Sequence, residues 1–459
     1  MQSQIVRYFE ECVAEKLPKK TKQSSLSIGN AIRSRLFIFL NCLVPNPSFD
    51  SQGKECLTTP TSLLLPERAS PILSPSFLKT LANETGIVEA VIEELAMKER
   101  SLLVKASKQG GKGKVLDVGK LEDAHGIGTS EPCSLILTEG DSAKALAVAG
   151  LEVVGRRHYG VLPLRGKILN VRDVTAAQIR ASKEVMSIVR AVGLDFCENY
   201  EHGTEGLRYS RVILMTDQDS DGSHIKGLVI NLFERYWPQL LYNNNFLHYI
   251  ATPLVKVRKA GDRKQGSSQS FYSLQEYDAW RLQMEKEAAG SAESFRVKYY
   301  KGLGTSTSAE AKEYFSNFNK TFKSFLSKSK EETSNAIDLA FSKLRVMDRR
   351  EWLQKVFSSS VFIDPALKEV SYNDFVDKEL IQFSSADNIR SIPSCIDGLK
   401  PSQRKVLYAC FKRKLEQEMK VVQLAGYVAE QTAYHHGEAS LHATIIGMAQ
   451  VSLSHIYSF

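Results

Sequence analysis

Near the start of the chain, apolar residues fall three or four positions apart, at Ile5, Tyr8, Phe9, Cys12, Val13 and Leu17. That spacing predicts an amphipathic helix with one buried face. A second apolar stretch at 32–43 predicts another helix or a strand. The basic segment between them, with Lys19, Lys20 and Lys22, is typical of a solvated loop or of a contact with phosphate.

From Cys133 onward, short apolar runs alternate with helical stretches. Residues 134–138 are followed by a helical pattern at 143–154, and residues 212–216 by one at 225–237. Alternation of this kind predicts an α/β domain built on a mostly parallel sheet.

The remaining segments have a helical or a linker character. Residues 309–357 are charged and helical in pattern, and residues 380–459 predict several helices around the turn signals at 391–402. Segment 57–80 is rich in Pro, Ser and Thr, and segment 105–114 in Gly and Lys, so both are typical of linkers or surface loops.

Composition narrows the class of protein only moderately. The 459 residues suggest two to four domains, and 60 Lys+Arg against 52 Asp+Glu fits a polyanionic partner without requiring one. The seven cysteines form no C-x-x-C pair, which argues against a zinc module and favours a reducing compartment. No signal peptide is visible, and the apolar run at 36–44 is far shorter than the roughly 20 residues of a membrane span. We therefore expect a soluble intracellular protein without a membrane partner.

Carboxylates follow two of the predicted strands. Glu139 and Asp141 come just after the first, and Asp217, Asp219 and Asp221 just after the second. Open α/β sheets bind ligands at the carboxyl ends of their strands, so the two loops converge if the strands are neighbours. Because clustered carboxylates repel one another, a hard cation is needed between them, and magnesium suits oxygen ligands and phosphate.

The acidic run D-Q-D-S-D-G has two other interpretations. It matches the opening of a calcium-binding EF-hand loop, but Leu228 stands where that loop needs a glutamate, and a β-type run precedes it. An acidic surface loop without function remains the plain alternative, and the paired E-G-D-S-A motif weakens it.

Four motifs together resemble the TOPRIM domain of type II topoisomerases: E-G-D-S-A, P-L-R-G-K-I-L-N-V at 163–171, D-Q-D-S-D-G-S-H-I-K-G at 217–227 and Y-Y-K-G-L-G-T-S-T-S at 299–308. The segment R-S-I-P-S-C-I-D-G-L-K-P-S-Q-R-K-V-L-Y at 390–408 then resembles the start of the winged-helix cleavage domain. Both lie on one chain, as in the eukaryotic form. The resemblance implies a Rossmann-like α/β TOPRIM domain, a mostly helical winged-helix domain and a short α+β remnant of the transducer.

The same resemblance implies these domain bounds: end of the transducer at 1–60, linker and approach to TOPRIM at 61–130, TOPRIM at 131–255, its extension and a helical connector at 256–375, and an incomplete winged-helix domain at 376–459. It implies Mg²⁺ ligation by Glu139, Asp217 and Asp219, with Asp221 in support, and Mn²⁺ or Ca²⁺ as substitutes in binding. The expected chemistry is reversible transesterification on DNA phosphate, in which Glu139 also relays a proton.

Expected contacts with double-stranded DNA come partly from the resemblance and partly from the residues themselves. Pro401 suits the first turn of a helix, and basic side chains at a helix N-terminus suit phosphate. The alternative interpretation for several of the basic residues named next is a solvated surface side chain without function. The candidate DNA-binding residues are Lys19, Lys20, Lys22, Lys167, Asn170, Arg349, Arg350, Lys400, Arg404, Lys405, Tyr434, His435 and His436.

S-F-D-S-Q-G-K-E at 48–55 resembles the transducer loop whose glutamine and lysine reach the γ-phosphate of ATP. Gln52 and Lys54 match that loop, whereas Gly53 replaces the usual threonine. The nucleotide fold is not recognisable here, so ATP belongs to the complete enzyme and the chain alone is not expected to hydrolyse it.

The pattern breaks near the C-terminus. The family continues after residue 450 to an Arg-Tyr pair that supplies the nucleophile, and Tyr457 lacks that setting. Truncation, a splice boundary or a degenerate paralogue all remain open. Two functions follow: part of a nuclear, homodimeric topoisomerase completed by a longer copy, expected to be inactive alone, or a non-catalytic DNA-binding fragment. A TOPRIM nuclease or primase is disfavoured, because it has no need of segment 390–459.

Overall fold

The computed structural model describes residues 2–450 apart from these gaps: 17–24, 40, 42, 45, 51–53, 55, 61–72, 108–118, 130, 244, 260–268, 273, 288–294, 301, 304–305, 317, 357–362, 365 and 435–436.

A six-stranded sheet forms the centre of the structure, in the order β2-β1-β3-β4-β8-β9. Its strands are β1 Ser134–Glu139, β2 Tyr159–Leu164, β3 Arg211–Met215, β4 Leu247–Ile250, β8 Phe322–Leu326 and β9 Glu369–Ser371. The first four are mutually parallel, β8 is antiparallel to β4, and β9 is parallel to β8. The predicted mostly parallel α/β sheet is therefore confirmed.

The strands are continuously apolar because both faces of the sheet are covered. Leu135 and Leu137 point into one core with helices α7 Ala176–Ala181, α8 Lys183–Val192, α9 Ser220–Tyr236 and α10 Pro238–Tyr242. Ile136 points the other way, into a core with α6 Gly140–Val154, α12 Ser308–Ser316 and α13 Phe318–Thr321. Alternate residues of one strand thus serve two cores, as expected for a covered parallel sheet.

The first of these cores extends toward the C-terminal side. It takes in side chains from α14 Lys330–Phe341, α15 Val346–Val356, α16 Tyr372–Asp374 and the π-helical η3 Phe375–Leu380. The short 3-10 helix η2 Lys343–Arg345, between α14 and α15, has no buried residue. The prediction of an entirely helical stretch at 309–357 was wrong at β8. There Phe322, Ser324 and Leu326 alternate with the buried Lys323 and Phe325, so the stretch has a period of two and pairs at the edge of β4.

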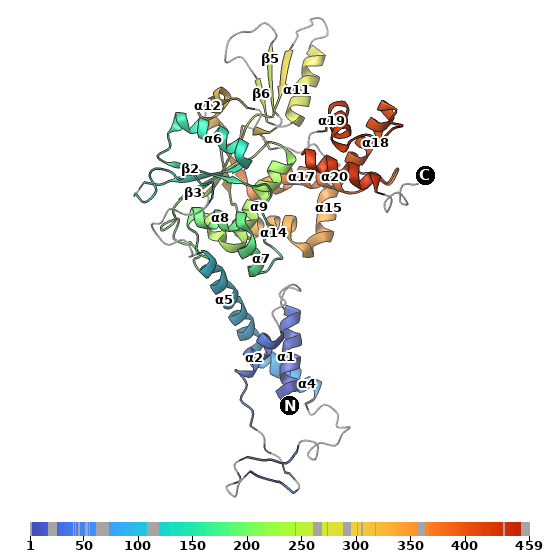
Figure 1. Cartoon of the computed structure of the whole chain (residues 1–459). Helices are drawn as coiled ribbons and strands as arrows, with labels where there is room; N and C mark the ends of the chain where they lie inside the picture. Colours follow the sequence, from blue (N-terminus) through green and yellow to red (C-terminus); the bar gives the residue numbers. More distant parts are fainter. Residues whose placement is uncertain are drawn as a thin grey trace.

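Three smaller units surround the sheet (Figure 1). The strands β5 Val255–Lys259, β6 Gln269–Phe271 and β7 Phe295–Tyr299 form an antiparallel sheet beside α11 Leu274–Glu287. Helices α17 Ile381–Ser391, α18 Pro401–Arg413, α19 Val421–Thr432 and α20 Glu438–Ala449 form the C-terminal bundle. The last three of these share a core around Val406 and Val428.

The N-terminal helices α1 Gln2–Lys16, α2 Ser25–Arg33 and α4 Pro75–Glu84 pack around a separate core with part of α5 Ile87–Ser107. Phe9 and Val13 are fully buried there, as the helical spacing predicted. The apolar stretch at 32–43 is helical only to Arg33, and Phe37 and Phe39 beyond it are exposed. Helix α5 runs from this unit to the main body, where it contacts α7 and α8 (Figure 1).

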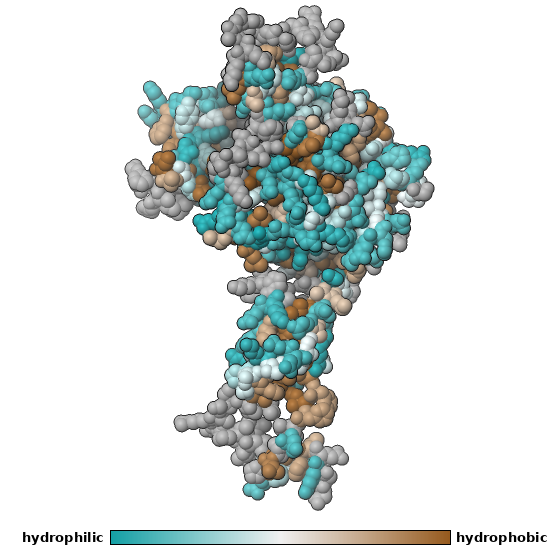
Figure 2. All heavy atoms as spheres, turned by 180° about the vertical axis from the view of Figure 1, so that it is seen from behind, coloured by the Kyte–Doolittle hydropathy of each residue, from teal (hydrophilic) through white to brown (hydrophobic). Residues whose placement is uncertain are grey.

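The main body, seen from behind, presents mostly hydrophilic side chains, with hydrophobic ones in separate patches (Figure 2). Within the described ranges, none of the helices combines the length and hydropathy that crossing a membrane demands.

Candidate metal and DNA-binding site

Glu139 and Asp217 meet at the carboxyl ends of the neighbouring strands β1 and β3. Glu139 is the last residue of β1, and the backbone N–H of Asp217 donates a hydrogen bond to its Oε2 at 3.0 Å. Two residues later, Asp219 caps the N-terminus of α9, where its Oδ1 accepts the N–H of Gly222 at 2.8 Å. The two acidic loops therefore converge, because their strands are adjacent and parallel.

Crowding of these carboxylates changes their protonation. Burial, and then repulsion from Asp217, raise the pKa of Glu139 to about 7. Burial, and then repulsion from Asp219, also raise the pKa of Asp217, although a backbone N–H from Leu303 opposes the change. The site therefore disfavours the ionised form of both carboxyl groups, and a bound cation would favour that form.

Asp221 has a different environment. Its Oδ1 lies 2.7 Å from Lys167 Nζ, and its Oδ2 lies 3.0 Å from a guanidinium nitrogen of Arg390. Burial alone would raise the pKa of Asp221, but these two cations hold it at about 2. Arg390 belongs to α17, so this contact ties the acidic centre to the C-terminal helices. Arg390 opens the 390–408 motif, but no pattern in the sequence assigns it this role.

The carboxylates of this site suit a magnesium ion that keeps part of its water shell. Among the described residues, no three His, Cys, Asp or Glu side chains converge closely enough to enclose an ion. Magnesium usually keeps several waters and takes only one or two protein carboxylates beside substrate phosphate, so the pair of Glu139 and Asp217 is sufficient for it. Asp141, in the first turn of α6, pairs with Lys120 on the surface instead.

Lys167 and Asn170 lie in a loop after β2 rather than on a strand. The Nδ2 of Asn170 donates to the backbone oxygen of Phe341 at 3.0 Å, and its Oδ1 accepts from Asn231. The amide of Asn170 is therefore used within the protein. Only Lys167 of the two reaches the acidic centre.

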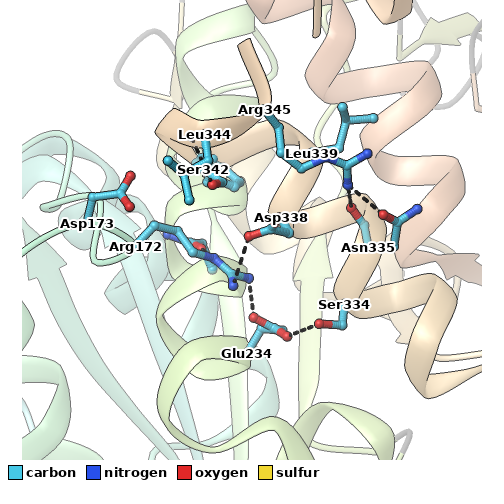
Figure 3. A network of polar contacts seen from close by, with 12 residues as sticks. Arg172, Asp173, Glu234, Ser334, Asn335, Asp338, Leu339, Ser342, Leu344 and Arg345 are labelled. Atoms are coloured by element: carbon cyan, nitrogen blue, oxygen red, sulfur yellow. Dashed lines mark hydrogen bonds and ion pairs between the residues drawn. The ribbon is translucent and has the colours of Figure 1, made fainter. Parts of the chain in front are cut away.

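Arg172 pins this loop to the helices behind it (Figure 3). Its side chain, 11% exposed, forms an ion pair with Glu234, which is 6% exposed. Ser334 donates to the other oxygen of Glu234 at 2.7 Å, and Asp338 approaches Arg172 at 3.5 Å. In addition, the backbone N–H of Lys343 donates a hydrogen bond to the carboxylate of Asp173 at 2.9 Å. The loop after β2 is thus fixed to both α9 and α14.

Arg349 and Arg350 differ in their accessibility. The guanidinium of Arg349 donates to the backbone oxygens of Leu339, at 3.0 Å, and of Ser342, and its burial lowers its pKa. Arg350 is exposed, and within the described part of the chain its one hydrogen-bond contact is with the sulfur of Met347, at 3.9 Å. Arg350 is the better placed of the two for an external phosphate.

Basic side chains gather at the N-terminus of α18, as predicted, with Pro401 in its first turn. Arg404 is engaged by Asp397 through two hydrogen bonds of 2.7 and 2.8 Å. Lys405 donates to the backbone oxygen of Ala433 at 3.3 Å. A groove of about 350 Å³ runs between these residues, and its lining comprises Pro401, Arg404, Lys405, Tyr408 and Thr432.

Family models match four consecutive parts of the chain. They are described as DNA gyrase B at residues 1–110, Toprim domain at 134–252, C-terminal associated domain of TOPRIM at 250–388, and the A-type subunit of DNA gyrase/topoisomerase IV at 390–457. The chain belongs to the type II DNA topoisomerase family. The order of the matches also agrees with the fused, eukaryotic-type arrangement.

Curated relatives support the same assignment. DNA topoisomerase 2, mitochondrial, of Dictyostelium discoideum is 46% identical over 97% of this chain, and DNA topoisomerase 2 of Saccharomyces cerevisiae is 46% identical over 97%. DNA topoisomerase 2-beta of Homo sapiens is 44% identical over 94%. The chain spans only 34%, 30% and 27% of these three proteins.

A solved structure agrees with the fold as well. The DNA-binding, cleavage and re-ligation domain of Plasmodium falciparum topoisomerase II is 48% identical and superposes with a TM-score of 0.64, covering 74% of this chain and 45% of that one. The described α/β sheet and C-terminal helices are therefore the TOPRIM domain and the start of the cleavage domain of a topoisomerase II.

Several expected topoisomerase site residues lie outside the described residues: Lys19, Lys20, Lys22, Gln52, His435 and His436. Lys54 is described, with φ of 54° and its ammonium 6.0 Å from the ring of Phe49. Tyr434 is 8% exposed, with Lys405 6.0 Å from its ring. The ATP-contacting role of Gln52 and Lys54 stays a prediction.

Proposed function

We propose that this chain supplies the metal-binding and DNA-gripping part of a type II DNA topoisomerase, which passes one double-stranded DNA through another by transient cleavage and religation. The observation that supports this most directly is the meeting of Glu139 and Asp217 at the ends of β1 and β3, with Asp219 at the N-cap of α9 two residues later. Arg390, bonded to Asp221, brings the first helices of the cleavage domain to the same place.

In this proposal Mg²⁺ is held by Glu139, Asp217 and Asp219, with Asp221 in support. The bound ion supplies stabilisation of negative charge on the DNA phosphate and the departing 3′ oxygen. Without the ion the pKa of Glu139 is about 7, so binding of a cation there should release a proton near neutral pH. In the same proposal Glu139 also has a role in relaying a proton. Mn²⁺ and Ca²⁺ are expected to bind at the same carboxylates.

The DNA partner is recognised by its backbone rather than by its bases. Lysines and arginines that contact phosphates, and not the edges of bases, favour sequence-tolerant, salt-sensitive binding. The contacts are assigned to the candidate residues already named, with Lys167, Arg350, Lys400 and Lys405 foremost because their side chains are not buried. The guanidinium of Arg404 is already bonded to Asp397, so Arg404 contributes to DNA binding indirectly, through the position of the loop that carries Asp397.

The complete enzyme acts as a homodimer in the nucleus and uses ATP, which Gln52 and Lys54 help to sense. These three attributes rest on kinship with topoisomerase 2 proteins, one of which is named as mitochondrial.

A titration of the chain with Mn²⁺ tests the proposal. The wild type should bind the ion, and Asp219→Ala should bind it at least tenfold more weakly. Asp278→Ala removes an exposed carboxylate of α11, in the smaller sheet unit, and serves as the matched control with unchanged affinity. Equal isotherms for wild type and Asp219→Ala would remove the acidic centre from metal binding.

A further inference from the structure

The loop between β7 and α12 reaches the acidic centre and touches Asp217. The backbone N–H of Leu303 donates to Asp217 Oδ1 at 2.7 Å, across 86 positions of sequence. Beside it, a Cβ built on Gly302 would stand 2.3 Å from Asp217 Oδ2 and 2.9 Å from Cγ. Gly302 has φ of +79°, a conformation that side chains rarely adopt. The carboxylate of Asp217 thus lies directly against a backbone that only glycine provides.

Leu303 anchors this contact from the other side. Its side chain is 2% exposed and packs in the core shared by Ile136, Met215 and Ile250 of strands β1, β3 and β4. Because the strands that carry Glu139 and Asp217 also hold the side chain of Leu303, the position of its N–H is set by the same core. The donor to Asp217 is therefore fixed relative to the rest of the acidic centre.

Glu310 fastens the two ends of the loop. Its Oε1 accepts from the hydroxyl of Tyr300 at 2.5 Å and from Lys298 at 2.7 Å, before the loop. Its Oε2 accepts the backbone N–H of Thr307 at 2.8 Å, after the loop. Partial burial would raise the pKa of Glu310, but these donors hold it at about 2, so the carboxylate is ionised at neutral pH. One side chain thus closes the loop at its base.

We propose that the 302–303 turn, closed by Glu310, is a positioning element that holds Asp217 for metal binding: the Leu303 N–H fixes one carboxylate oxygen, and Gly302 leaves room for the other. The proposal rests on the metal role of Asp217 in the proposed function. Second-sphere donors of this kind orient a ligand and affect metal affinity by tenfold or more when they are lost. None of the positioning residues is itself expected to touch the metal.

The first test compares two glycine substitutions with the same backbone penalty. Gly302→Ala places its new methyl group on the carboxylate of Asp217, which must turn away. Gly128→Ala has φ of +87° and nothing within 4 Å of the new Cβ. In Mn²⁺ titrations of the full chain, Gly302→Ala should bind at least tenfold more weakly than wild type, and Gly128→Ala within twofold of it. Equal affinities for the two variants would overturn the proposal.

A second pair avoids any steric clash. Glu310→Gln weakens the closure of the loop, whereas Glu313→Gln, three residues along α12, changes an outward carboxylate paired with Lys256. Glu310→Gln should lower Mn²⁺ affinity about threefold to tenfold, and Glu313→Gln should not lower it. If Gly302→Ala fails to fold, this pair decides, and equal affinities within it would count against the proposal.

Hydrogen exchange in EDTA separates the positioning contact from metal binding. The Leu303 amide should be protected in the metal-free wild type and exchange at least tenfold faster in Asp217→Ala, which removes its acceptor. Protection without Mn²⁺ binding would uphold the contact but overturn its metal purpose together with the proposed function. Mn²⁺ binding by a wild type whose Leu303 amide is unprotected would overturn this inference alone.

Discussion

Replacing Glu139 with glutamine removes a carboxylate whose ionisation the fold opposes. Burial and the nearby Asp217 raise the pKa of Glu139 from 4.5 to about 7. The gap between these values corresponds to about 3 kcal/mol of lost stability when the group ionises, and solvent screening of the partly exposed side chain reduces this to about 1.5 kcal/mol. Glutamine keeps the acceptor for the Asp217 N–H and carries no charge.

The direction follows from the folded pKa lying above the unfolded one. The stabilising effect of the protonated form is fully present below pH 4.5 and is lost as pH rises through about 7. In EDTA, between pH 5 and pH 8, the wild type should therefore lose about 1.5 kcal/mol more stability than Glu139→Gln.

Native-state hydrogen exchange of the β1 and β3 amides in urea measures this locally, because a chain of several domains need not unfold in one step. Glu152→Gln, on the exposed face of α6, is the control and should follow the wild type. Added Mg²⁺ should restore the stability of the wild type at pH 8 more than that of Glu139→Gln. Parallel pH profiles for wild type and Glu139→Gln in EDTA would refute the argument that burial and Asp217 oppose ionisation.

Three further predictions follow from other contacts. Glu234→Gln, which breaks a buried ion pair, should cost about 3 kcal/mol in urea unfolding, whereas Glu11→Gln, in an exposed pair, should cost under about 0.5 kcal/mol. Lys400→Ala with Lys405→Ala should flatten the slope of log affinity for DNA against log salt by roughly one unit per lost phosphate contact, and an unchanged slope would exclude both. Because the pKa of Asp221 is lowered, its ionised form gives stability that is present above the usual pKa of 3.8 and is lost as pH falls through about 2. Asp221→Asn should therefore lose about 1 kcal/mol of stability at pH 7 and show a shallower acid transition between pH 4 and pH 2.

The strands and the acidic residues that follow them were predictable from sequence because local patterns along the chain mark both. The buried runs that became β1 and β3 are continuously apolar, and Glu139 and Asp217 follow them directly. What could not be predicted depends on contacts between distant segments. Gly302 and Asp217 meet only after β7 and the loop beyond it have folded back over the sheet, and no spacing within 299–308 signals that meeting.

The loop after β2 shows the same limit in another form. Its residues Lys167 and Asn170 are similar in sequence position and polarity, yet the fold uses them differently. The amide of Asn170 is hydrogen-bonded to Phe341 and Asn231 inside the protein, whereas the ammonium of Lys167 is bonded to Asp221. Which polar side chain faces inward depends on the helices α9 and α14 that pack against the loop, and these come from 50 to 170 positions later in the chain.

The charges of the acidic centre are distributed unevenly, and that distribution indicates where a divalent ion would be drawn. Asp221 is already neutralised by Lys167 and Arg390. Within the described part of the chain, no cationic side chain forms an ion pair with Glu139 or Asp217, which receive only backbone N–H donors. Their burial, followed by repulsion among the neighbouring acidic groups, is consequently the unrelieved electrostatic cost of the site, and an added cation gains most beside them. Arg390 in turn pairs with Asp221 from α17, so a residue at the start of the cleavage domain offsets part of the negative charge of the TOPRIM centre.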